Sequence, residues 1–383
     1  MNSTVASPIR VLIADDSLLM REALRRVVES SPSLEVCGMA RNGLEAIERV
    51  HALQPDVVTL DIEMPLLDGI EALKQIMKDS PRPVIMVSSH THHGAELTLQ
   101  ALSMGAFDYL PKSEAGQALD PRRLRHELVE KIEAAAYSPL GRLHDPARAG
   151  ASEKFRQQEH FRVAPEIIAI GTSTGGPKAL QEIIPELPAD LPAPIIVVQH
   201  MPEGFTGPFA DRLNKISELR VREAEHGEVV ERGKVYVAPA GKQLAVQRGE
   251  LAAPSGNNSN IVISLSDDAT GLLHKPSVDM MMLSVTEVFG RYSMGIILTG
   301  MGNDGLLGMT AIANAGGITI GQDQDTSTVY GMPRACAENG VLQIIAPLPE
   351  IPEQILQALR YHTKDQKPEP SLSARAAAQG MSG

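Results

Sequence analysis

Along its first third, the chain alternates short apolar runs with segments in which apolar residues recur every three or four positions. Short runs bounded by turn formers are typical of buried strands, and longer periodic segments are typical of amphipathic helices. The predicted strands are Ile9–Ala14, Leu34–Ala40, Val57–Leu60, Val84–Ser88 and Phe107–Leu110. Five strand–helix units in about 130 residues predict a doubly wound parallel sheet with strand order 2-1-3-4-5.

The same alternation returns in the second half of the chain, after an interruption between Tyr137 and Val163. The interruption is rich in Pro, Gly and polar residues, which favours a linker that is helical in part. Beyond it, the predicted parallel strands are Ile167–Ile170, Ile195–Gln199, Met294–Leu298 and Ile318–Gln322. Three shorter runs separated by Gly-containing turns indicate hairpin strands at Val235–Val237, Gln243–Arg248 and Ile261–Leu265.

These patterns predict an α/β protein of two domains. A chain of 383 residues exceeds the length over which one hydrophobic core usually grows. We expect a flavodoxin-like (βα)5 domain over residues 1–136, a linker over 137–163, and a Rossmann-like doubly wound parallel sheet with an inserted β-hairpin region over 164–360. Residues 361–383 are polar and aperiodic, which predicts a disordered tail.

Composition narrows the possible functions. Lys and Arg total 35 against 47 Asp and Glu, and the net charge of −12 disfavours nucleic acid or an anionic membrane as the main partner. There is no apolar N-terminal segment and no apolar run near the length of a membrane span, so we expect a cytoplasmic protein without membrane insertion. The two cysteines, Cys37 and Cys336, are far apart and are expected to be buried reduced thiols.

A serine stands between glycines where a strand is expected to turn into a helix, in the stretch Gly171-Thr172-Ser173-Thr174-Gly175-Gly176-Pro177. Glycines on both sides allow the sharp turn of a nucleophile elbow, and the helix would point its free N–H groups at an oxyanion formed beside the serine. A phosphate-binding loop would need Lys and Ser or Thr where Pro177 and Ala179 stand, and a dinucleotide loop would need Gly at Ser173. A purely structural turn stays open at this point.

A nucleophilic serine also needs a base and a carboxylate that orients the base. His200 follows the predicted strand Ile195–Gln199, and Asp304 lies in the Gly-rich loop after Met294–Leu298. Because the carboxyl ends of parallel strands share one edge, Ser173, His200 and Asp304 are expected to converge there. Backbone N–H groups of the Gly-rich loop could serve as oxyanion donors.

Other histidines compete for the role of base. His274 precedes a predicted helix that Ser277 or Asp279 would cap, so we interpret it first as a residue of a substrate loop and second as the base. His362 would give the serine, acid, histidine order of α/β-hydrolases, but it lies at the edge of the expected tail. The N-terminal domain has three histidines close together, His90, His92 and His93. A solvated loop explains them better than a metal site does.

Carboxylates gather at the corresponding edge of the N-terminal sheet. Asp15 and Asp16 follow the first predicted strand, and Asp61 follows the third, its neighbour in the predicted order. Clustered oxygen ligands suit Mg²⁺, and Ser88 and Lys112 add a hydroxyl and an ammonium group at the ends of the next two strands. A cation and a lysine around one carboxylate favour phosphorylation of Asp61, although helix capping would explain any one of these residues alone.

The N-terminal domain resembles the response-regulator receiver domain over its full length, through the motifs Asp15-Asp16, Asp61-Ile62-Glu63-Met64-Pro65, Asp68-Gly69, Val87-Ser88-Ser89 and Pro111-Lys112. The resemblance implies that a histidine kinase phosphorylates Asp61. The implied ligands of Mg²⁺ are Asp15, Asp16, Asp61 and the backbone carbonyl of Glu63. Ser88 and Lys112 would contact the phosphoryl group, and Tyr109 would be the aromatic residue whose orientation changes.

The C-terminal domain resembles the catalytic domain of the chemotaxis protein-glutamate methylesterase (CheB) family, and the receiver, linker and this domain together match that family end to end. The motifs that carry the resemblance are Ile170 to Pro177, Val198 to Pro202, His274 to Asp279 and Thr299 to Gly305. It implies that Ser173 is the nucleophile, His200 the general base and acid, and Asp304 the orienting carboxylate. The implied oxyanion donors are the backbone N–H groups of Thr174 and Met301, with no cofactor in this domain.

The combined resemblance implies a phosphorylation-activated ester hydrolase. Its substrates would be glutamate γ-methyl esters, and glutamines, on methyl-accepting chemoreceptors in chemosensory adaptation. A chemotaxis histidine kinase would be the phosphodonor, and the unphosphorylated receiver would cover the mouth of the active site. A binding module that holds a ligand at the Ser173 loop without turnover is the rival, whereas the length and acidity of the second domain disfavour a DNA-binding output.

Overall fold

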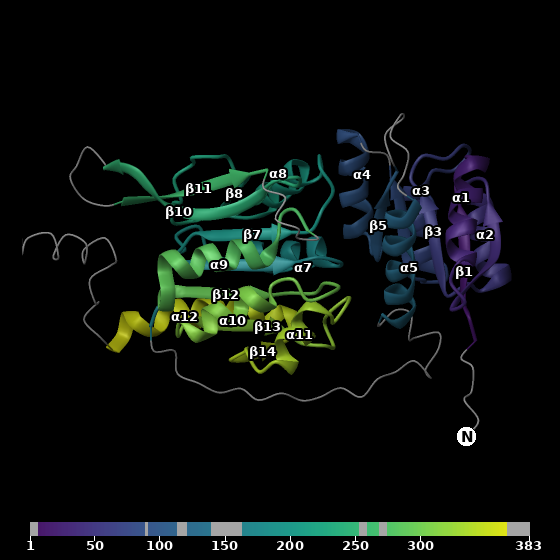
Figure 1. Ribbon diagram of the computed structural model, residues 1–383. Helices are drawn as coiled ribbons and strands as arrows, with labels where there is room; N and C mark the ends of the chain where they lie inside the picture. The colour runs from purple at the N-terminus through teal and green to yellow at the C-terminus, as the bar shows by residue number, and fades with distance from the viewer. Residues whose placement is uncertain are drawn as a thin grey trace, which may run out of the picture. The chain divides into compact units, whose positions relative to one another are not determined.

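The computed structural model (Figure 1) describes residues 7–88, 91–112, 121–138, 163–252, 259–267 and 274–365. The chain divides into two compact units, Met1–Ala151 and Ser152–Gly383, and the point of division lies within the predicted linker. Each unit has its own parallel sheet, which confirms the predicted α/β class.

The first unit has a five-stranded sheet in the predicted order β2-β1-β3-β4-β5, and every neighbouring pair is parallel. Its strands are β1 (Ile9–Ala14), β2 (Leu34–Ala40), β3 (Val57–Asp61), β4 (Val84–Ser88) and β5 (Asp108–Pro111). Its helices are α1 (Leu18–Glu29), α2 (Gly43–Leu53), α3 (Gly69–Asp79), α4 (His92–Ser103) and α5 (Pro121–Tyr137). Because β1 and β3 are neighbours, the loops that follow them meet at the carboxyl edge of the sheet.

Side-chain caps fix where the helices of this unit begin. Ser17, Asn42, Asp68 and Thr91 each accept a hydrogen bond from a backbone N–H in the first turn of α1, α2, α3 and α4. Such caps satisfy N–H groups that the helix itself leaves without partners, and each stabilises the start of its helix by about 1 kcal/mol. The loops between strand and helix are therefore short and well defined at the edge where the carboxylates lie.

The second unit has a seven-stranded sheet, parallel throughout, in the order β14-β13-β12-β6-β7-β9-β8. Its strands are β6 (Ile167–Thr172), β7 (Ile195–Gln199), β8 (Arg220–Glu223), β9 (Lys234–Val237), β12 (Ser293–Ile297), β13 (Ile318–Gln322) and β14 (Ile344–Ala346). Its helices are α7 (Gly176–Ile183), α8 (Thr206–Ile216), α9 (Val278–Phe289), α10 (Leu306–Asn314), α11 (Met332–Glu338) and α12 (Ile351–Asp365), with single 3-10 turns at Ile184–Glu186, Gly290–Tyr292 and Leu348–Glu350. A separate antiparallel pair consists of β10 (Gln243–Ala252) and β11 (Ser259–Ser266).

The prediction that Val235–Val237 is a hairpin strand is wrong. These residues lie in β9, which pairs in parallel with β7 on one side and β8 on the other. Val235, Tyr236 and Val237 are fully buried, as expected for an interior strand covered on both faces. Only β10 and β11 form the predicted hairpin region.

The apolar patterns also missed short elements at the edges of the second sheet. β8 has only Val221 buried among its four residues, and β14 is three residues long, so neither produces a recognisable apolar run. At the C-terminus, α12 continues to Asp365, five residues into the segment predicted as a tail, because no proline or glycine occurs between Pro352 in its first turn and Pro368. The rest of the predicted tail lies outside the described residues.

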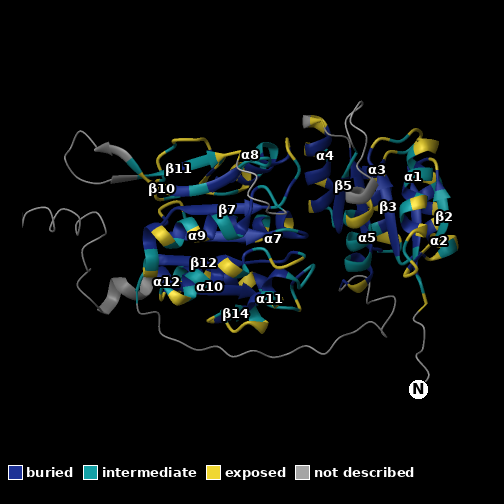
Figure 2. Ribbon diagram, in the orientation of Figure 1, coloured by how far each residue is buried: buried dark blue, intermediate teal, exposed yellow. Residues whose placement is uncertain are grey.

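Both sheets lie in the centre of their units, and their interior strands are buried (Figure 2). The side chains of Tyr236, Phe205 and Phe209 are among the largest that are fully buried. Close packing on both faces holds the strand ends rigidly, and these ends carry the candidate site residues. Among the helices that the structure describes, none has the length and apolar character needed to cross a membrane.

The two free cysteines are expected to differ in reactivity. Cys336 is fully buried and burial raises the pKa of its thiol to about 12, whereas Cys37 is only half-buried, contrary to the sequence prediction. At pH 8 a thiol with that pKa is a thiolate about once in 10⁴ molecules, so we expect iodoacetamide to modify Cys37 first and Cys336 only after unfolding. Peptide mass spectrometry with and without urea measures this, and equal native rates would contradict it.

Candidate functional site

The serine loop of the second unit folds as a sharp turn from β6 into α7. β6 ends at Thr172 and α7 begins at Gly176, whose N–H donates to the Ser173 carbonyl at 2.9 Å. Gly175 has a φ of 80°, and a Cβ atom there would lie 2.4 Å from the side chain of Thr328, so the turn requires glycine at this position. Ser173 is partly exposed at the tip of the turn, which is the geometry of a nucleophile elbow.

Ser173 and His200 follow neighbouring strands at matching register. Thr172 of β6 pairs with Gln199 of β7, and the N–H of His200 donates to the Thr172 carbonyl at 3.1 Å. The Gln199 side chain joins the two loops, because its amide donates to the carbonyls of Ser173 (2.9 Å) and His200 (3.0 Å). The two residues therefore stand next to each other at the carboxyl edge of the sheet.

The imidazole of His200 is bound at one nitrogen and open at the other. Its Nε2 lies 2.8 Å from Oδ2 of Asp304, and both side chains are only 10% exposed. Its Nδ1 is buried and has no hydrogen-bond partner among the described residues. A carboxylate at Nε2 favours the neutral tautomer with its proton on that nitrogen. Nδ1 is thus the atom that can accept a proton from a neighbouring hydroxyl group.

Asp304 is held by the N-terminus of α9. Its carboxylate accepts hydrogen bonds from Ser277 Oγ (3.0 Å) and from the N–H groups of Val278 (2.8 Å) and Asp279 (3.0 Å). Burial alone would raise the pKa of Asp304, but the bond to His200 and the backbone donors outweigh burial and hold that pKa well below its usual range. The dipole of a helix N-terminus also favours a carboxylate. Asp304 is therefore ionised at neutral pH.

These donors to Asp304 were missed by sequence reasoning. The pattern around Ser277 predicted only a helix cap, and Ser277 does cap α9 by accepting from the N–H of Met280 at 3.4 Å. The side chain of Asp279 accepts from the N–H of Gly308 at 2.9 Å and so joins the start of α9 to α10. No local pattern signals the contact with Asp304, since it depends on two loops that meet only in the folded sheet.

The predicted oxyanion donors flank the serine. The N–H of Ser173 donates to the Thr299 carbonyl at 3.1 Å, and a Cβ atom on Gly300 would lie 2.9 Å from the Ser173 Cβ, so the Gly-rich loop lies directly against the serine. Thr174 follows Ser173 in one loop and Met301 follows Gly300 in the other. Within the described part of the chain, the N–H of Met301 makes no hydrogen bond. It is therefore available to an oxyanion.

Among the candidate histidines that the structure describes, His200 is the one whose ring nitrogen is shown bound to Asp304. The ring of His274 stacks on the ring of His200, with centroids 3.9 Å apart and planes 13° from parallel. His93 is exposed on α4. The side chains of His92 and His362, and the whole of His90, lie outside the described residues.

In the first unit, the structure brings the predicted carboxylates and lysine together. Lys112 Nζ lies 3.0 Å from Oδ2 of Asp15 and 2.7 Å from Oδ2 of Asp61, and both aspartates are buried whereas Asp16 is exposed. Burial is the main reason that the pKa of Asp61 rises to about 6, with a smaller contribution from the charge of Asp15, and Lys112 opposes the rise. The two carboxylates outweigh burial and raise the pKa of Lys112.

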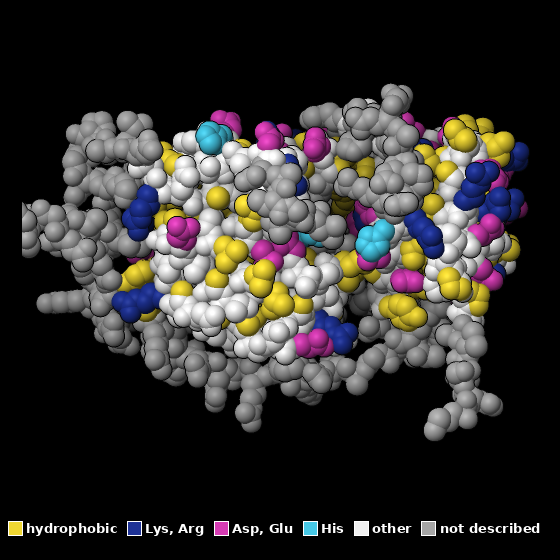
Figure 3. Space-filling model, in the orientation of Figure 1, with side chains coloured by type: hydrophobic (Ala, Val, Ile, Leu, Met, Phe, Trp, Pro, Cys, Tyr) yellow, Lys and Arg dark blue, Asp and Glu magenta, His cyan; other side chains and the backbone are white. Residues whose placement is uncertain are grey.

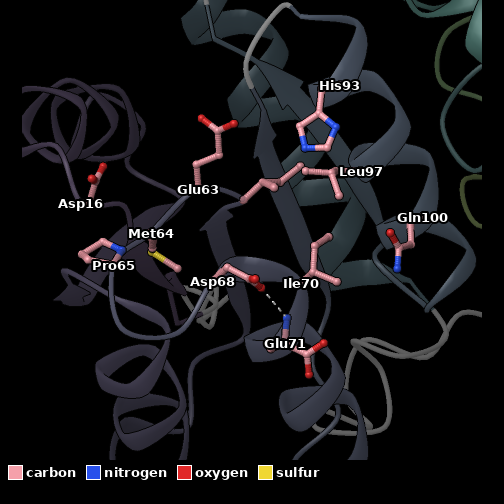
Figure 4. Close-up of a pocket in the computed structure, with 11 residues that line it drawn as sticks. Asp16, Glu63, Met64, Pro65, Asp68, Ile70, Glu71, His93, Leu97 and Gln100 are labelled. Atoms are coloured by element: carbon pink, nitrogen blue, oxygen red, sulfur yellow. Dashed lines mark hydrogen bonds between the residues drawn. The ribbon is translucent and has the colours of Figure 1, made fainter.

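This donor set fits a hard divalent cation. One carboxylate oxygen from each of Asp15, Asp16 and Asp61 can lie within 4.8 Å of the others, and a single ammonium group leaves the cluster negative. A hollow of about 600 Å³ adjoins the cluster, with Asp16 and Glu63 on its wall (Figure 4). Figure 4 also shows Asp68 accepting from the N–H of Glu71, at 2.8 Å, so this carboxylate serves as a helix cap. That the Glu63 carbonyl is a ligand stays a prediction.

Ser88 ends β4, Tyr109 lies within β5, and their side chains have different partners. The Ser88 hydroxyl donates to the Gly94 carbonyl (3.1 Å) and accepts from Thr98 Oγ1 (2.7 Å), so it is bound to α4. Tyr109 is buried, and Lys131 Nζ lies 5.2 Å from the centroid of its ring. A phosphoryl contact of Ser88 would therefore require its hydroxyl to leave α4.

Comparisons with known proteins match both units. The family model described as CheB methylesterase matches residues 168–355, and the one described as response regulator receiver domain matches residues 11–122. A protein of Pyrococcus abyssi named protein-glutamate methylesterase/protein-glutamine glutaminase is 44% identical over 92% of this chain and 94% of its own length. A protein of Desulfitobacterium hafniense with the same name is 41% identical over 92% and 98%. The crystal structure of the Thermotoga maritima CheB methylesterase catalytic domain is 40% identical and covers 51% of this chain and 99% of its own, with a TM-score of 0.47.

Proposed function

The chain belongs to the CheB family of response-regulator methylesterases, and from that premise we propose that it is a phosphorylation-activated serine hydrolase. Its substrates are glutamate γ-methyl esters on methyl-accepting chemoreceptors, and it deamidates receptor glutamines by the same chemistry. The observation that carries the proposal is the His200 imidazole, which follows the strand next to that of Ser173, is bound to Asp304 through Nε2 and has a buried Nδ1 without a hydrogen-bond partner among the described residues.

The reaction proceeds by acyl transfer to Ser173. As Oγ attacks the γ-carbonyl carbon, its proton passes to Nδ1 of His200, and the carbonyl oxygen becomes an oxyanion that the N–H groups of Thr174 and Met301 stabilise. The C–O bond to the methoxy group then breaks and His200 returns the proton, so that methanol leaves. Water, deprotonated by His200, hydrolyses the acyl-enzyme and releases the glutamate carboxylate. A glutamine side chain loses ammonia in the same way.

Asp304 keeps His200 in the productive tautomer. Because its pKa is held well below the usual range, the carboxylate stays charged through the cycle and stabilises the imidazolium that forms in each half-reaction. Hydrophobic side chains gather over α9 and α10 in Figure 3, and Leu283 of α9 and Leu307 of α10 are 44% and 64% exposed. A protein substrate would cover such a surface.

The receiver controls this activity through Asp61. A chemotaxis histidine kinase supplies the phosphoryl group, and Asp15, Asp16, Asp61 and the Glu63 carbonyl would hold Mg²⁺, which would neutralise phosphoryl charge. Lys112 already contacts Asp61, and Ser88 is the hydroxyl that would turn toward the phosphoryl group. The side chain of Tyr109 changes its orientation when the Ser88 hydroxyl turns. Phosphorylation then shifts the chain from an inhibited to an active population.

Methanol release from a methylated chemoreceptor tests the proposed function. The full chain should release methanol, and faster with Mg²⁺ and a small phosphodonor such as acetyl phosphate than without them. An unmethylated receptor is the control for background. Tight receptor binding with no methanol or ammonia produced would favour the binding-module alternative instead.

Asp61→Asn is expected to abolish stimulation by the phosphodonor and to leave the basal rate. Regulatory couplings of this kind are typically worth 5- to 150-fold, so the variant should lose a change of about that size. Methanol release with and without acetyl phosphate measures it. If a fragment of residues 164–383 is no faster than the unphosphorylated full chain, inhibition by the receiver is not the mechanism.

A further inference from the structure

The imidazole of His200 has a second imidazole stacked on its face. The rings of His274 and His200 are 3.9 Å apart between centroids and 13° from parallel. The edge of the His200 ring is bound at Nε2 to Asp304, and its buried Nδ1 has no hydrogen-bond partner among the described residues. His274 therefore contacts the face of the His200 ring, whereas the Asp304 carboxylate contacts its edge.

The position of His274 is fixed by the same segment that holds Asp304. Gln243, 3% exposed, donates from Nε2 to the His274 carbonyl at 2.9 Å and accepts at Oε1 from the N–H of Ser277 at 2.8 Å. Ser277 in turn donates its hydroxyl to Asp304 at 3.0 Å. The buried Gln243 thus fixes both the backbone of His274, whose ring stacks on His200, and the start of α9, which holds Asp304.

A flat ring stacked on His200 has two effects on this residue, which accepts and returns a proton in the proposed reaction. It restricts rotation of the His200 ring, so that Nε2 stays on Asp304 and Nδ1 keeps the orientation in which it would accept the serine's proton. It also offers an aromatic face to the imidazolium that His200 becomes in each half-reaction, and aromatic faces attract cations. An aliphatic side chain of similar size would fill the space but supply neither a planar surface nor that attraction.

We propose that His274 is a positioning residue for the proposed esterase reaction, which acts through His200 by ring stacking and not by transferring a proton itself. The inference rests on the proposed function, since it assigns His274 a part in that same acyl transfer. It predicts that another planar aromatic ring can replace His274, whereas an aliphatic side chain cannot.

The test compares His274→Phe with His274→Leu in the full chain. Two rates are measured: methanol release from methylated receptor, and covalent labelling of Ser173 by a fluorophosphonate, which reports activation of the serine without any receptor. We expect His274→Leu to lower kcat and the labelling rate together by about 5- to 30-fold with KM nearly unchanged, and His274→Phe to stay within about threefold of the unaltered chain. Thermal unfolding of each variant checks that the fold is kept.

Each other result overturns the proposal. If both variants lose labelling by about 10³-fold or more, His274 itself transfers protons. If KM rises in both variants while labelling is unchanged, His274 contacts the substrate instead. Two variants as active as the unaltered chain would also overturn it. An unaltered chain that labels at Ser173 but releases no methanol would overturn the proposed receptor substrate alone, because the labelling rates of the two variants would still decide the role of His274.

Discussion

Ser173→Ala is expected to fold normally and to lose demethylation of the receptor by at least about 10⁴-fold. The reason for the loss is that no other hydroxyl follows β6 at the register that places Ser173 beside His200. The fold should be kept because the hydrogen bonds that Ser173 makes with described residues involve its backbone: its N–H donates to the Thr299 carbonyl, and its carbonyl accepts from the Gly176 N–H and the Gln199 amide. Methanol release measures the first effect, and urea denaturation should show a change in unfolding free energy within about 0.5 kcal/mol.

A matched control for this substitution is Ser217→Ala. The Ser217 hydroxyl is buried without a hydrogen-bond partner among the described residues, and it lies just after α8, away from the triad residues in sequence. Its loss should leave methanol release unchanged. Turnover by Ser173→Ala close to that of the unaltered chain would remove Ser173 as nucleophile, and with it the proposed mechanism.

The sequence predicted which residues meet because parallel strands impose one simple rule. Each predicted strand ends at a known residue, and neighbouring parallel strands end at the same edge, so Ser173 and His200 could be placed together from Ile167–Ile170 and Ile195–Gln199. The same rule placed Asp15 beside Asp61, and the structure has both within ion-pair distance of Lys112. Residues at strand ends could thus be predicted from local patterns.

Interactions that depend on a helix or a distant loop could not be predicted in this way. The N-terminus of α9 holds Asp304, and Thr98 of α4 holds Ser88, but neither contact leaves a mark on the local sequence. The error at Val235–Val237 has the same origin, since a short apolar run fits a hairpin or a buried parallel strand equally well. Which one forms depends on pairing with β7 and β8. β7 lies far from β9 in the sequence, and β8 carries charged side chains.

Asp304→Asn is expected to reduce methanol release by about 10⁴-fold and also to destabilise the second unit. The carboxylate accepts hydrogen bonds from Ser277, Val278, Asp279 and His200, and an amide would turn an NH₂ group toward at least one of these donors. Leaving buried donors without an acceptor costs about 1–3 kcal/mol. Urea denaturation at pH 7 measures the loss of stability, and the same samples give the loss of turnover.

Measuring this destabilisation at several pH values distinguishes the contribution of the Asp304 charge from that of the shape of the side chain. Because the folded-state pKa of Asp304 lies below its unfolded value of about 3.9, the ionised carboxylate contributes stability that is fully present above that value and is lost as pH falls below it. The difference between Asp304→Asn and the unaltered chain should therefore shrink as the pH falls below about 3.9.

Asp279→Asn is the matched control, since burial and the charge of Asp304 raise the pKa of Asp279, although its bond from Gly308 opposes them, and a neutral amide removes that repulsion. We expect Asp279→Asn to keep turnover and to lose less stability than Asp304→Asn, since the loss of hydrogen bonds is offset in part by the removal of that repulsion. If it is as damaging as Asp304→Asn, the start of α9 matters for its packing and not for holding an ionised Asp304.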